Sequence, residues 1–182
     1  ISRSNNIEVK TLKKGTPFTT LDGIERKLNE SDLMVCDGNT PMCIAGVFGG
    51  SEHGINYETS TIFLESAFFN PISIRKTAKS HSINSDASFR FERGVDIELV
   101  DYALKRAALL ICEICSGKIC SDIIDEYPKK NQNKSILLNY EKTNKLIGQI
   151  ISPEEIKSIL TSLDFKINNI TETGVGITVP SY

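Results

Sequence analysis

Glu65 stands in an apolar stretch of the chain, where an unpaired charge is costly. Residues 64–69 read Leu-Glu-Ser-Ala-Phe-Phe, and with the two-residue period of a strand Glu65 shares a face with Phe63, Ala67 and Phe69. A carboxylate on an apolar face is unfavourable unless another group pairs with it. Two interpretations remain open: Glu65 is a structural carboxylate with an internal partner, or it is a polar probe in an otherwise apolar binding pocket.

A second candidate is the glycine-rich run at residues 45–52, Ala-Gly-Val-Phe-Gly-Gly-Ser-Glu. Gly46, Gly49 and Gly50 have no side chain, so the backbone there can turn sharply or approach a ligand closely. The run is not a Walker loop, because no Gly-Lys-Ser/Thr follows, and its spacing is not that of a dinucleotide fingerprint. A bulged strand end with a tight turn would use the same glycines, so this signal is weak by itself.

Basic side chains gather in residues 71–95. This stretch carries five Lys or Arg and two acids, a local charge of +3 in a chain whose net charge is −2. Such a patch predicts contacts to nucleic-acid phosphates, although a solvated helix face with Arg–acid pairs is the alternative. The net charge excludes a protein held to nucleic acid by overall charge, so any RNA contact is local or shared with a partner. The five cations are Arg75, Lys76, Lys79, Arg90 and Arg93.

Other chemistries find no support in the residue pattern. Neither of the two histidines, His53 and His81, lies in an H-E-x-x-H type pattern, and no Gly-x-Ser-x-Gly nucleophile motif is present. Cys112 and Cys115 fall in the apolar half of an expected helix, where cysteine is usually a small core residue, and only Cys120 is nearby. We therefore predict reduced thiols and no metal site. No apolar run reaches the length of a membrane span.

The elements that position these residues are mainly strands in the first 70 residues and helices afterwards. Asn70-Pro71 is typical of a helix start and predicts a helix to Ser80. A longer helix is expected over 97–116, with Gly117 as a left-handed C-cap, followed by a strand at 119–124. Asp22-Gly23 predicts a two-residue hairpin turn. The strands are expected at 7–10, 18–21, 24–28, 33–36, 43–47 and 61–68.

A polar stretch at 128–134 is expected to link two domains, which we place at 1–127 and 135–182. In the second domain, Ser152 and Pro153 predict the start of a helix. The fold class is therefore predicted as α+β: a mixed sheet with packed helices, followed by a small, truncated helix-and-strand domain. The second domain's expected elements are strands at 136–138, 165–167 and 175–179 and helices at 141–146 and from 153 to about 163.

Five segments, in this order, resemble the β subunit of bacterial phenylalanine–tRNA ligases over essentially the whole chain. Each is modestly specific alone, and the five together are very specific. The resemblance implies that residues 1–127 are the C-terminal part of a B3/B4 editing domain and that 135–182 begin a B5 domain. Because the first residue is Ile1 rather than Met, we expect an excised piece of a longer protein. The segments are Thr20–Arg26, Ala45–Gly50, Leu64–Ala67, Ile74–Ala78 and Asp86–Asp96.

In that family the editing domain hydrolyses tyrosine wrongly attached to tRNA(Phe). The resemblance implies that Glu65 recognises the tyrosine hydroxyl, that Gly46 and Gly49 line the pocket, and that Ser85 and Ala87 lie near the ester. Ser85 stands where Thr is usual, but the hydroxyl is kept, so we expect function to survive. No catalytic residue is assigned, because the resemblance implies attack by water assisted by a tRNA ribose hydroxyl. The family site also uses a histidine from a segment before Ile1, so the chain alone is expected to edit weakly or not at all.

The resemblance also implies partners: tRNA(Phe) and an α subunit, in a cytoplasmic α2β2 enzyme. ATP and Mg²⁺ would serve the aminoacylation centre of that whole enzyme, and no residue here is assigned to them. A rival interpretation is a non-catalytic scaffold that binds tRNA or the α subunit. A third is a nucleic-acid-binding module in residues 135–182. The four lysines against five acids there give −1, which argues against a free-standing DNA binder.

Overall fold

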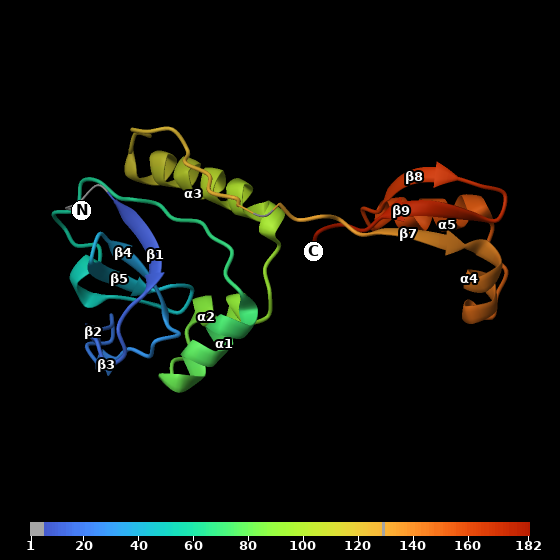
Figure 1. The fold of residues 1–182 in the computed structure, drawn as a ribbon. Helices are drawn as coiled ribbons and strands as arrows, with labels where there is room; N and C mark the ends of the chain where they lie inside the picture. Colours follow the sequence, from blue (N-terminus) through green and yellow to red (C-terminus); the bar gives the residue numbers. More distant parts are fainter. Residues whose placement is uncertain (1–5, 129) are drawn as a thin grey trace. The chain divides into compact units, whose positions relative to one another are not determined.

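The chain folds into two compact units, and each is described by itself. The computed structural model describes residues 6–128 and 130–182; the first unit ends at Ser121 and the second runs from Asp122 to Tyr182 (Figure 1). Residues 1–5 of the predicted first domain and Lys129 of the predicted linker lie outside the described residues. Both units combine strands with helices, which confirms the predicted α+β class. All strand pairs among the described residues are antiparallel, so the mixed sheet predicted for the first unit is wrong. Of the helices described, none has the length and apolar character needed to cross a membrane.

The first unit is built around a four-stranded antiparallel sheet in the order β1-β4-β5-β6. The predicted strands at 7–10 and 33–36 are confirmed, whereas the one predicted over 43–47 ends at Ile44, because Gly46 turns the chain with φ +66°. Between β4 and β5 a two-residue turn places Gly38 at φ +57°, where glycine meets no steric penalty. The strands are β1 (Ile7–Thr11), β4 (Leu33–Asp37), β5 (Thr40–Ile44) and β6 (Phe48–Gly49).

A separate hairpin of β2 (Pro17–Thr19) and β3 (Glu25–Lys27) carries the Asp-Gly pair. The hairpin was predicted correctly, but its two-residue turn was not. The Gly23 N–H donates to the Thr20 carbonyl at 2.8 Å and the Thr20 N–H to the Ile24 carbonyl at 3.1 Å, so the loop has three residues. Only Gly23 then needs positive φ, +76°. Asp22 instead accepts two hydrogen bonds from the Arg26 guanidinium, at 3.0 and 2.9 Å.

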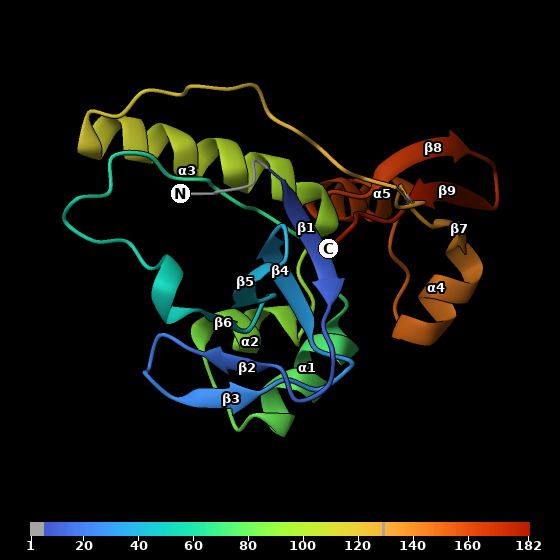
Figure 2. The same ribbon diagram turned by 60° about the vertical axis from the view of Figure 1, so that its left-hand side comes forward.

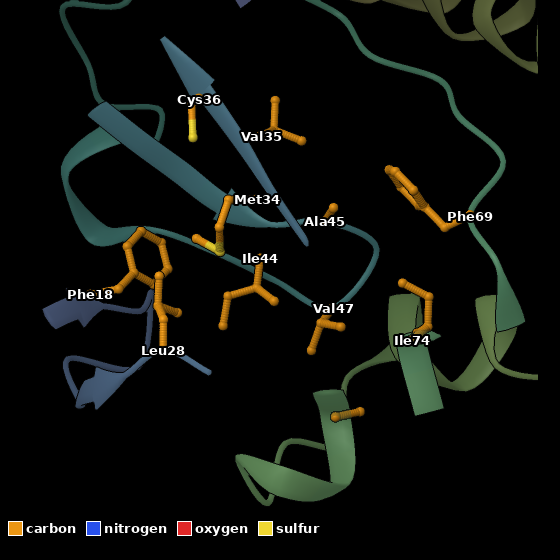
Figure 3. Packing of buried hydrophobic residues seen from close by; sticks show 11 residues of the cluster. Phe18, Leu28, Met34, Val35, Cys36, Ile44, Ala45, Val47, Phe69 and Ile74 are labelled. Carbon is orange, nitrogen blue, oxygen red and sulfur yellow. The ribbon is translucent and has the colours of Figure 1, made fainter. Parts of the chain in front are cut away.

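Two helices pack beside the sheet and against each other: α1 (Pro71–Ser80) and α2 (Asp86–Phe91). The predicted start of α1 is confirmed, since the Asn70 side chain accepts from the backbone N–H groups of Ile72 and Ser73. The core includes residues of both the sheet and α1. In Figure 3, Ile44 at the end of β5 and Val47 in the turn that follows lie on the side of the sheet nearest Ile74 of α1. These helices therefore complete the core that the sheet begins.

The predicted strand over 61–68 is wrong. These residues form an extended connection between η1 (Ser51–His53) and α1, with no strand pairing along it (Figures 1 and 2). Alternation is present in the sequence, but an extended segment becomes a strand only where a neighbour shares its backbone hydrogen bonds. Phe63 is accordingly 64% exposed. The strand predicted at 119–124 is wrong for the same reason, and Ile124 is 84% exposed.

The helix predicted over 97–116 is present but begins as a 3-10 turn, η2 (Ile97–Leu99), and continues as α3 (Val100–Cys115). Asp96 caps the start, because its side chain accepts from the Glu98 N–H at 3.1 Å. The left-handed C-cap is Ser116, at φ +53°, rather than the predicted Gly117. The helix ends one residue earlier than expected, and Ser116 takes a left-handed conformation that is uncommon for a residue other than glycine. No residue of α3 is buried.

The second unit is a three-stranded antiparallel sheet in the order β7-β9-β8 with two helices. Its predicted strands and helices are confirmed, and Ser152 caps its second helix by accepting from the Glu155 N–H. Close packing of the strands constrains Gly174, since a Cβ there would collide with the backbone carbonyl oxygen of Leu138. Val175, in the central strand, is fully buried. The elements are β7 (Ser135–Asn139), α4 (Tyr140–Ile147), α5 (Pro153–Ser162), β8 (Lys166–Ile170) and β9 (Gly174–Thr178).

A buried carboxylate ties the loop before β4 to the end of α1. Asp32 is 1% exposed and accepts from the Asn29 backbone N–H at 2.7 Å and from the Thr77 hydroxyl at 3.0 Å. Its other contact is His81 Nε2, 2.6 Å from Oδ2. Three partners satisfy a group that would otherwise be costly to bury. Sequence patterns had suggested no role for Asp32 or Thr77.

The variant Thr77→Val is expected to lower the free energy of unfolding of the first unit by about 1–3 kcal/mol, because it removes one donor and leaves a buried carboxylate oxygen short of a partner. Hydrogen exchange of the α1 amides measures this separately from the second unit. Thr11→Val, at an exposed position on β1, is the matched control. A loss no larger than the control's would contradict the prediction.

Candidate functional site

An open cavity of about 410 Å³ lies between the connection that precedes α1 and the start of α3. The Ser66 hydroxyl anchors this connection by donating to the Val100 carbonyl at 2.9 Å. The cavity has the size of a small-molecule site and mostly apolar walls, with a few polar groups among them. Its lining includes Gly46, Glu65, Ser66, Phe69, Phe91 and Asp96.

Glu65 lines this cavity and has no hydrogen-bond or ion-pair partner among the described residues. Burial raises the pKa of its carboxyl above the ordinary value of 4.5, yet the residue as a whole keeps an exposed surface. Both observations fit a carboxylate on the wall of an open cavity, partly desolvated by apolar neighbours and still reachable from outside. The structural interpretation of Glu65, which required an internal partner, is not supported.

The charge of Glu65 also acts on Cys43 of β5. Burial, and secondarily the Glu65 carboxylate, raise the pKa of the Cys43 thiol to about 11. At neutral pH this cysteine is a protonated thiol, which is a poor nucleophile. Cys43 is therefore poorly suited to act as a nucleophile.

Gly46 forms part of the cavity's lining for a steric reason. A Cβ at this position would lie 2.8 Å from Phe69 Cδ2 and 2.9 Å from Ile74 Cδ1. The rings of Phe69 and Phe91 pack in a tilted pair, with centroids 5.2 Å apart. Lack of a side chain at residue 46 thus admits the aromatic rings, and the positive φ of Gly46 turns the strand end. The tight turn that was one interpretation of this glycine is therefore present, whereas its close approach to a ligand stays a prediction.

The other predicted pocket residues do not line this cavity. A Cβ at Gly49 would meet Leu21 of the hairpin loop at 2.8 Å. The Ser85 hydroxyl donates to the Val47 carbonyl and accepts from the Ser88 N–H, which makes Ser85 the N-cap of α2. Ala87 is exposed in the first turn of the same helix. Of the five predicted pocket residues, the structure brings Gly46 and Glu65 together.

The five predicted phosphate-facing cations are all exposed on α1, on α2 or just after it. Arg93 forms local contacts: it donates to the Phe89 carbonyl at 2.8 Å and to the Glu92 carboxylate at 2.9 Å, and its guanidinium lies 3.5 Å from the Phe89 ring centroid. The alternative of an Arg–acid pair therefore holds for Arg93. The remaining four, Arg75, Lys76, Lys79 and Arg90, form no ion pair within the described part of the chain.

Sequence reasoning assigned no role to Phe91 or Asp96, which also line the cavity. Both lie in the segment 86–96, which was used for the resemblance. A second acidic residue near an apolar run was the available signal, but only the fold brings it to the same cavity as Glu65. Within 6–128 and 130–182, no three His, Cys, Asp or Glu side chains are placed to hold a metal ion.

Comparison with known families defines the class of protein. The model of the B3/4 domain matches residues 1–116, and that of the tRNA synthetase B5 domain matches residues 136–182. The antiparallel first unit with its cavity is thus a B3/4 domain, and it precedes a B5 domain of the kind found in tRNA synthetases.

Curated relatives give the particular family. The phenylalanine–tRNA ligase beta subunit of Bacteroides thetaiotaomicron is 52% identical over 180 residues, which cover 99% of this chain and 22% of that protein. Those of Porphyromonas gingivalis and Geobacter metallireducens are 48% and 41% identical, over 99% and 96% of this chain and again 22% of each relative. The chain belongs to the phenylalanine–tRNA ligase beta subunit family, which confirms the resemblance, and it spans 22% of the length of these relatives.

The variant Gly46→Ala is expected to destabilise the first unit more than Gly23→Ala. Both glycines have positive φ, so each alanine carries a backbone cost of about 1–2 kcal/mol. At Gly23 the new methyl group would meet nothing within 4 Å, whereas at Gly46 it would press on Phe69 and Ile74, adding about 1–3 kcal/mol. The free energies of unfolding of the two variants measure the difference. Equal losses of stability would show that Phe69 and Ile74 can move aside at no measurable cost.

Proposed function

We propose that the cavity is the editing pocket of a phenylalanine–tRNA ligase and takes the tyrosyl group of tyrosyl-tRNA(Phe) for hydrolysis. The observation that carries this proposal is the unpaired Glu65 carboxylate on the wall of a largely apolar cavity. Phe69 and Phe91 suit an aromatic side chain, and the carboxylate suits its phenolic hydroxyl. Membership in the ligase family supports the choice of substrate.

Physical chemistry explains why such a second site is needed. A hydrophobic pocket that binds phenylalanine for attachment to tRNA rejects tyrosine poorly, because tyrosine differs only by an added hydroxyl. A site that hydrogen-bonds this hydroxyl rejects the analogue that lacks it by about 10⁴–10⁵. Phenylalanine in this cavity would leave Glu65 desolvated and unpaired, so correctly attached phenylalanine is spared.

In the proposed reaction Glu65 binds and orients the substrate, and water attacks the ester with help from the terminal ribose hydroxyl of the tRNA. Gly46 keeps the aromatic lining in place. Ser85 and Ala87, at the start of α2, are proposed to border the ester, with Ser85 acting through the position of the helix, since its hydroxyl is already bonded. Gly49 is proposed to contribute by holding the hairpin loop, since its carbonyl accepts a hydrogen bond from the Leu21 N–H at 3.0 Å.

The whole protein is proposed to work as the β subunit of a cytoplasmic α2β2 ligase that attaches phenylalanine to tRNA(Phe) with ATP and Mg²⁺. The described residues offer no ligand set for the metal, so no step through ATP or Mg²⁺ is assigned to this chain. The exposed cations on α1 and α2 are proposed to face tRNA phosphates, because phosphate contacts position a nucleic acid without reading its sequence.

The first test of the editing function is release of tyrosine from tyrosyl-tRNA(Phe) by the full αβ enzyme. Glu65→Ala is expected to lower the rate by at least 100-fold, because the phenol loses its charged acceptor, while charging with phenylalanine is unchanged. Glu65→Gln keeps a carbonyl acceptor, so its rate of tyrosine release is expected to lie between those of the wild type and Glu65→Ala. Unchanged release in Glu65→Ala would reject the pocket and leave the non-catalytic scaffold as the better interpretation.

The proposed phosphate contacts are tested by salt dependence. Replacing Arg75 and Lys79 together by Gln in the full enzyme is expected to weaken tRNA(Phe) binding and to reduce the slope of log affinity against log salt by about 2. The exposed Lys13 and Lys27, elsewhere in the first unit, serve as a matched double control. Equal salt slopes in the two double variants would contradict the phosphate contacts and would mean that the α1 cations form a solvated helix face.

A further inference from the structure

The cavity has a second carboxylate, Asp96, contributed by the start of η2 rather than by the connection that carries Glu65. One Asp96 oxygen, Oδ1, accepts from the Glu98 N–H at 3.1 Å, which fixes the orientation of the carboxylate at the head of the 3-10 turn. Oδ2 makes no hydrogen bond among the described residues, and Asp96 is half-buried. The side chain is thus held in place with one acceptor oxygen still available.

No cation in the described part of the chain pairs with either carboxylate of the cavity. Two acids and no base among apolar walls give the cavity a negative potential, which in a partly desolvated site is felt more strongly than in water. A ligand that fits this distribution carries a positive group near one acid and a neutral or hydrogen-bonding group near the other.

We propose that Asp96 binds the α-ammonium group of the aminoacyl ester, while Glu65 receives the side-chain hydroxyl. This inference rests on the proposed editing function and narrows its substrate class to esters with a free amino group. Esters whose amino group is acylated, as in peptidyl esters, present an uncharged amide at this position and are excluded. The amino-acid product of hydrolysis gains a carboxylate, which the two acids repel, so the same charges favour its release.

The experiment compares two esters on the same tRNA, in the full αβ enzyme: the tyrosyl ester and its desamino analogue, the 3-(4-hydroxyphenyl)propanoyl ester. In the wild type, the tyrosyl ester is expected to be hydrolysed with the higher kcat/KM. Asp96→Asn is expected to lower kcat/KM for the tyrosyl ester at least tenfold more than for the desamino ester, mainly through KM. Asn caps helices about as well as Asp, so the turn at η2 is preserved.

Asp101→Asn is the matched control, because Asp101 is exposed on α3, pairs with Lys105 and does not line the cavity. Equal losses for both esters in Asp96→Asn would make Asp96 a structural residue and overturn the proposal. So would a wild type that hydrolyses both esters equally well. Failure of the editing function itself would appear separately, as unchanged tyrosine release in Glu65→Ala.

Discussion

The packing of the Phe69 ring on the backbone of Gly46 is the contact on which the first unit depends. A side chain at residue 46 would overlap the ring, so the end of the sheet can meet the connection before α1 only because this residue has none. The contact fixes where the chain from Glu65 to Phe69 enters the core. The position of the carboxylate in the cavity is therefore a consequence of close packing at a glycine.

Glu65 is a group that the protein itself does little to stabilise. Because burial raises the pKa of its carboxyl above 4.5, ionisation costs stability, and this cost is absent at low pH and grows as pH rises through the folded pKa. Asp22 behaves in the opposite way: hydrogen bonds, chiefly from Arg26, lower its pKa, so its contribution is present at neutral pH and lost on acidification. Asp22 therefore stabilises the fold, whereas the carboxylate of Glu65 destabilises it, which is consistent with the ligand-binding role that we propose for Glu65.

The sequence was informative where structure depends on neighbouring residues. The cap at Asn70 and the hairpin around Gly23 follow from local chemistry and were predicted. The strand at 61–68 was not there, because alternation tells which side chains face alike but not whether a partner strand is present. Of the residues that line the cavity, Gly46 and Glu65 were predicted and others were not, for a related reason. Asp96 and Phe91 reach it from segments distant in the chain, so their place depends on tertiary packing that no local pattern describes.

The distribution of charge in the cavity sets what a hydrolytic site here is able to reject. A carboxylate without a partner among the described residues discriminates between ligands mainly through the free-energy cost of leaving it unpaired. A ligand that lacks the matching group binds with that cost, and a ligand that carries the group removes it. In the proposed reaction, that penalty would fall at Glu65 on an aromatic ring without a hydroxyl, and at Asp96 on an ester without an ammonium. These two selective interactions would act at opposite ends of the same amino acid. The apolar walls of the cavity would then contribute binding affinity and shape complementarity, but not the selectivity itself.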